Sequence, residues 1–138
     1  MTSRPALLIA ALLSAGCTAS TGTEPSRLGT SLPFKVGTSY DLPAGGALSV
    51  TLLAVENDSR CPASVQCVTA GSATITLGVQ LGTGPTVPAS VSLGATNNTV
   101  ATGTLRATFD SLTPYPAVPG PLKPQSAYTA WLTFRPAP

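Results

Sequence analysis

Apolar and polar residues alternate along much of the chain, which is the period-two pattern of strands that bury one face. The most regular run covers residues 73–81, where every second residue is apolar. Shorter runs of apolar residues with strand-like spacing are found at residues 34–40, 48–55, 87–93, 100–109 and 128–134. After the first sixteen residues, no stretch has the 3.6-residue period of an amphipathic helix. The pattern predicts an all-β domain.

Residues that favour turns separate these runs. The chain contains 13 glycines and 14 prolines, and 43–46 and 82–85 carry turn-forming combinations of the two. Five prolines between residues 113 and 125 predict a long surface loop, because a central strand would not tolerate them. We therefore expect an antiparallel β-sandwich of six or seven strands over residues 34–138, either Ig-like or a partly open barrel.

The first sixteen residues have the features of an export signal. Arg4 supplies a positive charge, an apolar run follows, and small residues precede Cys17. The apolar run is too short to span a bilayer. Leu13-Ser-Ala-Gly-Cys17 resembles the bacterial lipobox, in which the cysteine is lipid-modified and becomes the mature N-terminus. This resemblance implies a membrane anchor on Cys17, and the alternative is plain secretion with Cys17 as an unpaired thiol.

Residues 17–33 are rich in Thr, Ser, Gly and Pro and contain few apolar residues. Such a segment cannot bury a core, so we expect a flexible tether between the lipid and the domain. Thr18 stands where an aspartate favours retention of lipoproteins in the inner membrane. The lipobox resemblance therefore implies a lipid-anchored location in the cell envelope, at the outer membrane where the host has one.

Cys61 and Cys67 enclose five residues, a span that a disulfide can close. The loop-entropy model gives such a ring about 2.4 kcal/mol of stabilisation. Export to an oxidising compartment favours this bond, and it leaves no cysteine over if Cys17 carries lipid. Within the same stretch, Arg60 is expected at an exposed rim, paired with Asp58 or Glu56 for only about 0–1 kcal/mol.

The segment from Asp58 to Gly71 reads Asp-Ser-Arg-Cys-Pro-x-x-Val-x-Cys-Val-x-Ala-Gly. It resembles a motif of small bacterial envelope lipoproteins of unknown function, which usually carry Trp where this chain has Thr69. The sequence at 114–116 and the pattern at 128–132 resemble the closing segments of the same proteins. The resemblance covers about residues 34–135 and implies an envelope lipoprotein, but it brings no established activity.

The composition argues against several chemistries. Only 9% of the residues are charged, the net charge is +2 and there is no histidine. No basic patch for nucleic acid is therefore expected, and the commonest general base is missing. Two cysteines without histidine are too few for a zinc site, and five carboxylates are too few and too scattered for calcium. We expect a monomer that is not an enzyme and that has no cofactor or metal.

Two functions of different class remain open. The first is a non-enzymatic module that binds an envelope protein or a glycan, or has a structural role. The second is a protease inhibitor or sensor that acts through the disulfide-closed loop around Arg60. The candidate partner contacts are Arg60, Asp58, Trp131 and Tyr115. Trp131 is out of phase with the apolar face of its strand, and Tyr115 precedes a proline whose peptide bond is a candidate for the cis form.

Overall fold

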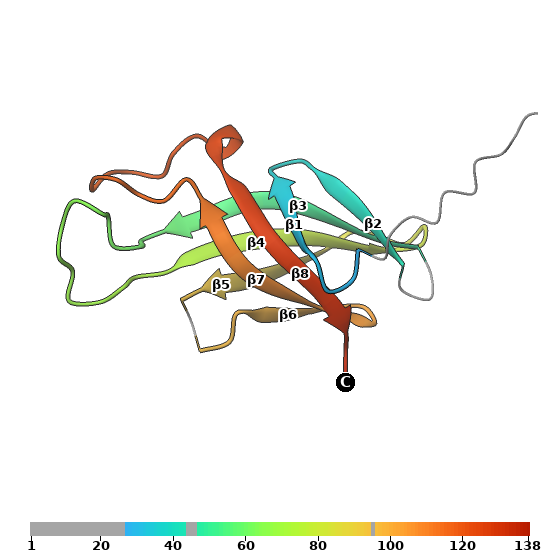
Figure 1. Ribbon diagram of the computed structural model, residues 1–138. Coiled ribbons are helices and arrows are strands. Elements are labelled where there is room, and N and C mark those ends of the chain that lie inside the picture. Colours follow the sequence, from blue (N-terminus) through green and yellow to red (C-terminus); the bar gives the residue numbers. More distant parts are fainter. Residues whose placement is uncertain (1–26, 44–46, 95) are drawn as a thin grey trace, which may run out of the picture.

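Two antiparallel sheets pack face to face and make up almost the whole fold (Figure 1). The computed structural model describes residues 27–43, 47–94 and 96–138, so Cys17 and the expected export signal lie outside it. The elements are β1 (Ser31–Lys35), β2 (Ser39–Pro43), β3 (Ala47–Asp58), β4 (Ala73–Leu81), β5 (Val87–Leu93), β6 (Thr99–Thr102), β7 (Leu105–Thr113), the 3-10 turn η1 (Gln125–Ala127) and β8 (Thr129–Pro136). Sheet A has the strand order β1-β8-β7-β6, and sheet B has the order β2-β3-β4-β5. The expected antiparallel β-sandwich is confirmed.

The core lies between the inner faces of the two sheets. In β4, Ala73, Ile75 and Leu77 point inward and are fully buried, while the threonines between them are partly exposed. β8 alternates in the same way, with Ala130, Leu132 and Phe134 buried. The rings of Phe34 and Phe134 lie 5.9 Å apart and join the neighbouring strands β1 and β8. Alternation in the sequence predicts this core because each strand buries one face only.

The structure has eight strands where six or seven were expected, because two of the predicted strands are each interrupted by a turn. The run at 100–109 divides into β6 and β7 around Gly103, which has φ +67°. The run at 34–40 divides into β1 and β2 around Gly37, with φ +84°, and these strands belong to different sheets. Glycine adopts positive φ without the steric cost that a side chain brings.

Two β-bulges in β3 change which side chains face the core. The first register shift lies between Leu52 and Ala54, so Leu53 points outward and Val55 is buried. The second lies between Val55 and Asn57, and it brings Asp58 into register with the buried Ala73. Residues directly opposite in a ladder share a face, so the carboxylate of Asp58 points toward the end of the core.

The ordered fold begins earlier than the predicted boundary at residue 34. β1 begins at Ser31, and the N–H of Gly29 donates a hydrogen bond of 2.8 Å to the carbonyl oxygen of Phe134. The tether assigned to residues 17–33 is therefore too long at its C-terminal end. The turn assigned to 43–46 has its residues 44–46 outside the described part of the chain.

Two further expectations were wrong in detail, and the cis bond considered for Tyr115–Pro116 lies at the preceding proline. Leu81 is 55% exposed, because it ends β4 and lies against Gly103 of the β6–β7 turn. β7 continues past residue 109 to Thr113, since a bulge at Asp110 restores the pairing with β8. The cis proline bond of the described residues is Thr113–Pro114 rather than Tyr115–Pro116.

The two ends of the sandwich differ. At one end, two long loops extend beyond the strands: the disulfide loop (residues 59–72) and the proline-rich loop (residues 114–124), which lie side by side at the left of Figure 1. At the other end, an apolar groove of about 340 Å³ opens between β4, β5 and the β6–β7 turn. Leu81 and Val87 border this groove and are exposed.

Candidate functional site

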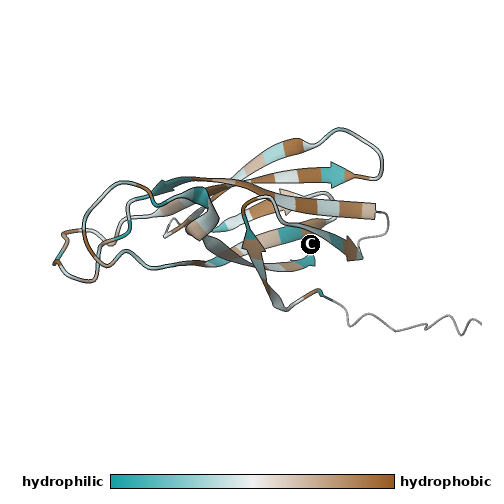
Figure 2. Cartoon of the chain, turned by 90° about the horizontal axis from the view of Figure 1, so that it is seen from above, coloured by the Kyte–Doolittle hydropathy of each residue, from teal (hydrophilic) through white to brown (hydrophobic). Residues whose placement is uncertain are grey.

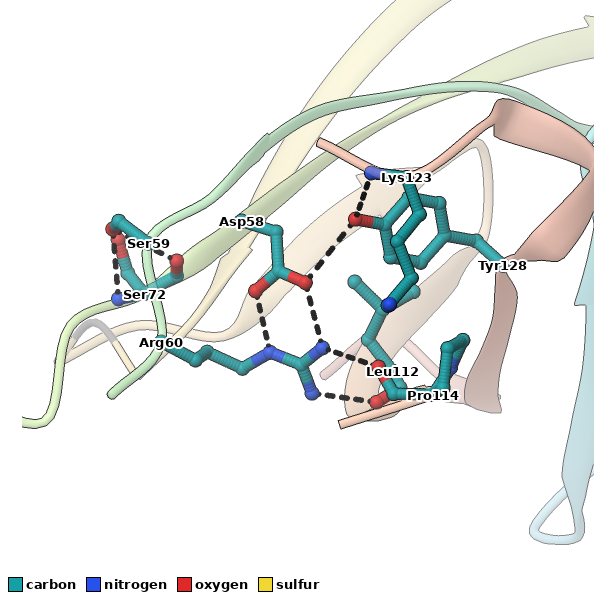
Figure 3. Close-up of polar contacts among 8 residues, drawn as sticks. All are labelled: Asp58, Ser59, Arg60, Ser72, Leu112, Pro114, Lys123 and Tyr128. Carbon is teal, nitrogen blue, oxygen red and sulfur yellow. Dashed lines mark hydrogen bonds and ion pairs between the residues drawn. The ribbon is translucent and has the colours of Figure 1, made fainter. Parts of the chain in front are cut away.

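A buried ion pair lies at the base of the two loops (Figure 3). The guanidinium of Arg60 donates from Nε to Oδ1 of Asp58 at 2.7 Å and from Nη2 to Oδ2 at 2.9 Å. The side chains of Arg60 and Asp58 are only 7% and 4% exposed. Paired bonds between a guanidinium and a carboxylate are the strong, directional form of this interaction.

Arg60 also connects the two sheets. It donates to the carbonyl oxygen of Leu112 at 2.6 Å and to that of Pro114 at 3.0 Å, at the end of β7 (Figure 3). Its guanidinium lies 4.9 Å from the centre of the Tyr115 ring, within the range of a cation–π contact. Arg60 thus joins the end of β3 in sheet B to the end of β7 in sheet A.

Tyr128, which lies between η1 and β8, completes the cluster. Its buried hydroxyl donates to Oδ2 of Asp58 at 3.3 Å and accepts the N–H of Lys123 at 3.2 Å. The carboxylate, the hydroxyl and the proline-rich loop border a pocket of about 260 Å³. Every buried side-chain polar atom of the described residues has a hydrogen-bond partner. We call the cluster of Asp58, Arg60 and Tyr128 the brace.

The electrostatics of the brace follow from its geometry. Burial raises the pKa of Asp58, but the hydrogen bonds and charge of Arg60, with the Tyr128 hydroxyl, outweigh burial and lower the pKa below its ordinary value. A carboxylate with a lowered pKa that already accepts three hydrogen bonds is a weak general base. The role of the brace that follows from this geometry is to hold the two loops in place.

The lowered pKa predicts a loss of stability in acid. In the unfolded chain Asp58 takes up its proton at the ordinary pKa near 3.8, before the folded protein does. Stabilisation by the ion pair is therefore present above that value and is lost as the pH falls through the folded pKa. Urea denaturation between about pH 5 and pH 2 should show a steeper loss in the wild type than in Asp58→Asn. Parallel curves for the two proteins would contradict this.

The disulfide between Cys61 and Cys67 is confirmed, with a Cα–Cα distance of 5.9 Å. At the base of its loop, the N–H of Ser59 donates to the carbonyl of Ser72 at 2.7 Å, and that of Cys61 to Ala70 at 2.8 Å. These bonds prolong the pairing of β3 with β4 into the loop. The disulfide then closes the segment that lies beyond them.

Backbone hydrogen bonds join the disulfide loop to the proline-rich loop. Ala63 donates to the carbonyl of Pro116 at 3.0 Å, and Ser64 donates to that of Ala117 at 3.1 Å. Proline has no N–H, so a proline-rich segment contributes mainly acceptors to such a contact. The two loops therefore form one body, which the brace fixes at its base.

We expect the double substitution Cys61→Ser/Cys67→Ser to lower the free energy of unfolding by about 2 kcal/mol, because the unfolded chain loses a small closed ring. The far-UV circular dichroism should be unchanged, since the sandwich core does not contain the disulfide. Urea denaturation measures the difference, and wild type treated with reductant serves as the control. Equal midpoints for oxidised wild type and the double variant would contradict the prediction.

Both joined loops carry exposed apolar side chains, and parts of the loops appear brown in Figure 2. We call these side chains the loop tip: Val65, Val68, Tyr115 and Val118. Val68 follows the disulfide and is fully exposed, and Tyr115 is 55% exposed despite its contact with Arg60. Apolar groups held in water on a fixed frame are typical of interaction sites.

The structure corrects two of the four candidate partner contacts. Arg60 and Asp58 do not lie on an exposed rim, because the second bulge of β3 turns Asp58 inward and the carbonyl oxygens at the end of β7 bind Arg60. An inhibitor whose Arg60 enters a partner's cleft would need an outward-pointing guanidinium, and the brace does not provide one. Tyr115 lies in the loop tip. Trp131 is half-buried on the outer face of sheet A, away from the core.

The sequence interpretation missed Val68, Val118 and Gln125. Val68 directly follows Cys67, so a loop closed by a disulfide could have indicated its exposure. Gln125 of η1 makes two bonds to the backbone of Val55: its Oε1 accepts the N–H at 2.8 Å and its Nε2 donates to the carbonyl at 3.0 Å. No local pattern distinguishes a glutamine that pairs with a strand 70 residues away.

The comparisons with known proteins are negative: no protein-family model, curated protein or solved structure matches the chain. Among the described residues, no helix is long and apolar enough to cross a membrane. No group of three or more potential metal ligands among His, Cys, Asp and Glu occurs in the described ranges.

Proposed function

We propose that this chain is a non-enzymatic, lipid-anchored module of the bacterial cell envelope that binds a protein partner through its loop tip. The observation that carries the proposal is the rigid presentation of exposed apolar side chains. Val68 and Val118 stand in water on loops that are joined by backbone hydrogen bonds, closed by a disulfide and fixed by a buried ion pair. A loop ordered before binding loses little conformational entropy when it binds.

The loop tip fits a protein surface with an apolar depression. Valine and tyrosine side chains offer no charge to such a partner, and the nearest arginine is occupied within the brace. Tyrosine adds a ring and a hydroxyl, the combination that makes it frequent at protein interfaces. The loop tip is therefore more suited to apolar docking than to recognition of a charged peptide.

The anchoring part of the proposal rests on cysteine pairing and on the lipobox resemblance. The disulfide uses two of the chain's three cysteines, which leaves Cys17 without an intrachain partner. The resemblance to envelope lipoproteins around residues 58–71 points to the same location. A flexible tether of about ten residues between Cys17 and the first described residue would have a root-mean-square length of about 16–19 Å.

A photo-crosslinking residue placed at Val68 should capture a discrete protein adduct in cells that produce the chain. The same residue at Val87, which is also an exposed valine but borders the groove at the opposite end, is the matched control. Val68→Asp should abolish an adduct formed from position 118. Identical adducts from positions 68 and 87, or no adduct from 68, would contradict binding at the loop tip.

A fatty-acid analogue supplied during growth should label the wild-type protein, which should then fractionate with membranes. The variant Cys17→Ala should remain unlabelled. Labelling is expected because thioether attachment of lipid needs the Cys17 sulfur. Cys61→Ser/Cys67→Ser is the control, since it leaves Cys17 in place and should still be labelled. An unlabelled wild type in the soluble fraction would contradict the anchor without affecting the loop tip.

A further inference from the structure

The outer face of sheet A carries a row of polar side chains that neither the core nor the brace uses. Its central strand β8 presents Thr129, Trp131, Thr133 and Arg135 outward, and the strands on either side add serine and threonine hydroxyls. The loop tip plays no part in this face. It is therefore a second, independent surface of the molecule.

Two arginines lie directly opposite each other on this face. Arg106 of β7 is in register with Arg135 of β8, both side chains are exposed, and neither forms an ion pair with a described residue. Side chains opposite each other in an antiparallel ladder are about 5 Å apart at Cβ, and like charges at that separation repel. An anion bound between the two guanidiniums would remove this repulsion and would accept hydrogen bonds from both.

A shallow polar pocket of about 240 Å³ adjoins the arginines, bordered by Thr108, Asp110, Thr133 and Arg135. Asp110 is the bulged residue of β7, and its Oδ2 accepts hydrogen bonds of 2.7 Å from the hydroxyls of Ser31 and Thr133. Its Oδ1 has no hydrogen-bond partner among the described residues. The pocket thus offers a free carboxylate acceptor and threonine hydroxyls beside a cationic pair.

Trp131 lies further along the same strand. It is four residues from Arg135 on the same face, about 13 Å away by the rise of a β-strand. Pro33 of β1 and Ser111 of β7 flank it in register. An indole at this position can cover the apolar face of a sugar ring, because an aromatic side chain combines an apolar body with a polar edge. The spacing is long enough for a short run of linked rings.

The charge of the two outer faces differs in sign. Sheet A carries Lys35, Arg106 and Arg135 with one carboxylate, whereas the exposed charges on the outer side of sheet B in the described ranges are Asp41 and Glu56. Hydroxyl pairs such as Ser39–Thr51 and Thr74–Ser92 occupy much of sheet B. A negatively charged ligand would therefore bind the outer face of sheet A in preference to that of sheet B.

We propose that the outer face of sheet A binds an acidic polysaccharide along β8. Arg106 and Arg135 hold a carboxylate of the polymer, Asp110 and the threonines beside it bind sugar hydroxyls, and Trp131 covers a ring. An anionic lipid surface fits less well. Electrostatic membrane binding uses clusters of about four to eight basic residues, and this face has three with a carboxylate among them.

Trp131 is the only tryptophan of the chain, so its fluorescence reports directly on this face. The full chain carrying Cys17→Ser, which has no site for an acyl anchor, is titrated with polygalacturonate. We expect saturable binding with a change in Trp131 emission and a raised denaturation midpoint. Fully methyl-esterified polymer, which has the same backbone without the charge, should bind at least tenfold more weakly.

The variant Arg106→Gln/Arg135→Gln should lose at least tenfold in affinity for polygalacturonate while it folds normally, because both side chains are exposed. Arg135→Gln is compared with Lys123→Gln, which removes one positive charge from the proline-rich loop and should change the affinity by less than twofold. Equal binding of the two polymers, or equal effects of the two single substitutions, would overturn the proposal. Stronger binding to phosphatidylglycerol vesicles than to polygalacturonate would also overturn it, in favour of a membrane surface.

Discussion

Arg60→Ala should lower the free energy of unfolding by about 3–5 kcal/mol, because it leaves the buried carboxylate of Asp58 without its counter-charge. The carbonyl oxygens of Leu112 and Pro114 lose their donor in the same change. Urea denaturation at neutral pH measures the effect. Arg106→Ala is the matched control, since this exposed arginine lies on the outer face of sheet A, outside the brace, and should change stability by no more than about 0.5 kcal/mol.

The double variant Arg60→Ala/Asp58→Asn separates two contributions to this loss of stability. One is the cost of an unpaired charge in a buried site, and the other is the loss of the hydrogen bonds that Arg60 makes. Removing both charges should restore part of the stability, because no uncompensated ion remains in the low-dielectric site. Arg60→Lys should not rescue the wild-type value, since a lysine ammonium cannot reproduce two bonds to Asp58 together with bonds to two carbonyl oxygens. A loss below about 1 kcal/mol for Arg60→Ala would mean that solvent reaches the pair and that the brace contributes little.

Gly71→Ala should destabilise the domain by more than about 2 kcal/mol, since a non-glycine residue at positive φ costs roughly 1–2 kcal/mol and here a steric clash is added. Gly71 has φ +70°, and a Cβ there would overlap the backbone carbonyl of Ser59. That carbonyl lies in the paired base of the disulfide loop, where Ser59 also bonds Ser72. Relief would require the base of the loop to open.

Gly37→Ala isolates the conformational part of this cost. Gly37 has φ +84° and no atom within 4 Å of an added Cβ, so its substitution adds strain but no clash. The difference between the two variants in denaturation midpoint therefore measures how firmly the loop base is packed. Equal losses at the two positions would show that the carbonyl of Ser59 moves aside at little cost.

Local patterns in the sequence were enough for the strands that bury one face without interruption. The alternation in β4 gave its inward residues correctly up to Val79, and the phase of Trp131 placed it on the outer face of β8. The disulfide followed from the spacing of Cys61 and Cys67. The break in the pattern at Leu53 was visible, but only the register of β3 against β4 shows that it is a bulge.

The brace could not be predicted beyond the pairing of Arg60 with Asp58. Its burial depends on Leu112 and Pro114, which are more than 50 residues away in the sequence, and on a bulge that no residue type announces. The expectation of an exposed Arg60 was reasonable for a charged residue in a polar loop, and tertiary contacts overrode it. The loop tip is the complementary case, because apolar residues usually indicate burial and here they face water.

The brace joins the sheets at one end of the sandwich only. At the other end the apolar groove lies between β5 and the β6–β7 turn, where the side chain of Leu81 lies against Gly103. Local opening of the fold therefore has an easier side, since side-chain contacts in a groove are lost more readily than a buried ion pair with its hydrogen bonds. Amide hydrogen exchange should therefore be fastest in β5 and β6 and slowest in the strand ends next to the brace. Such breathing would leave the loop tip and its base intact during partial unfolding.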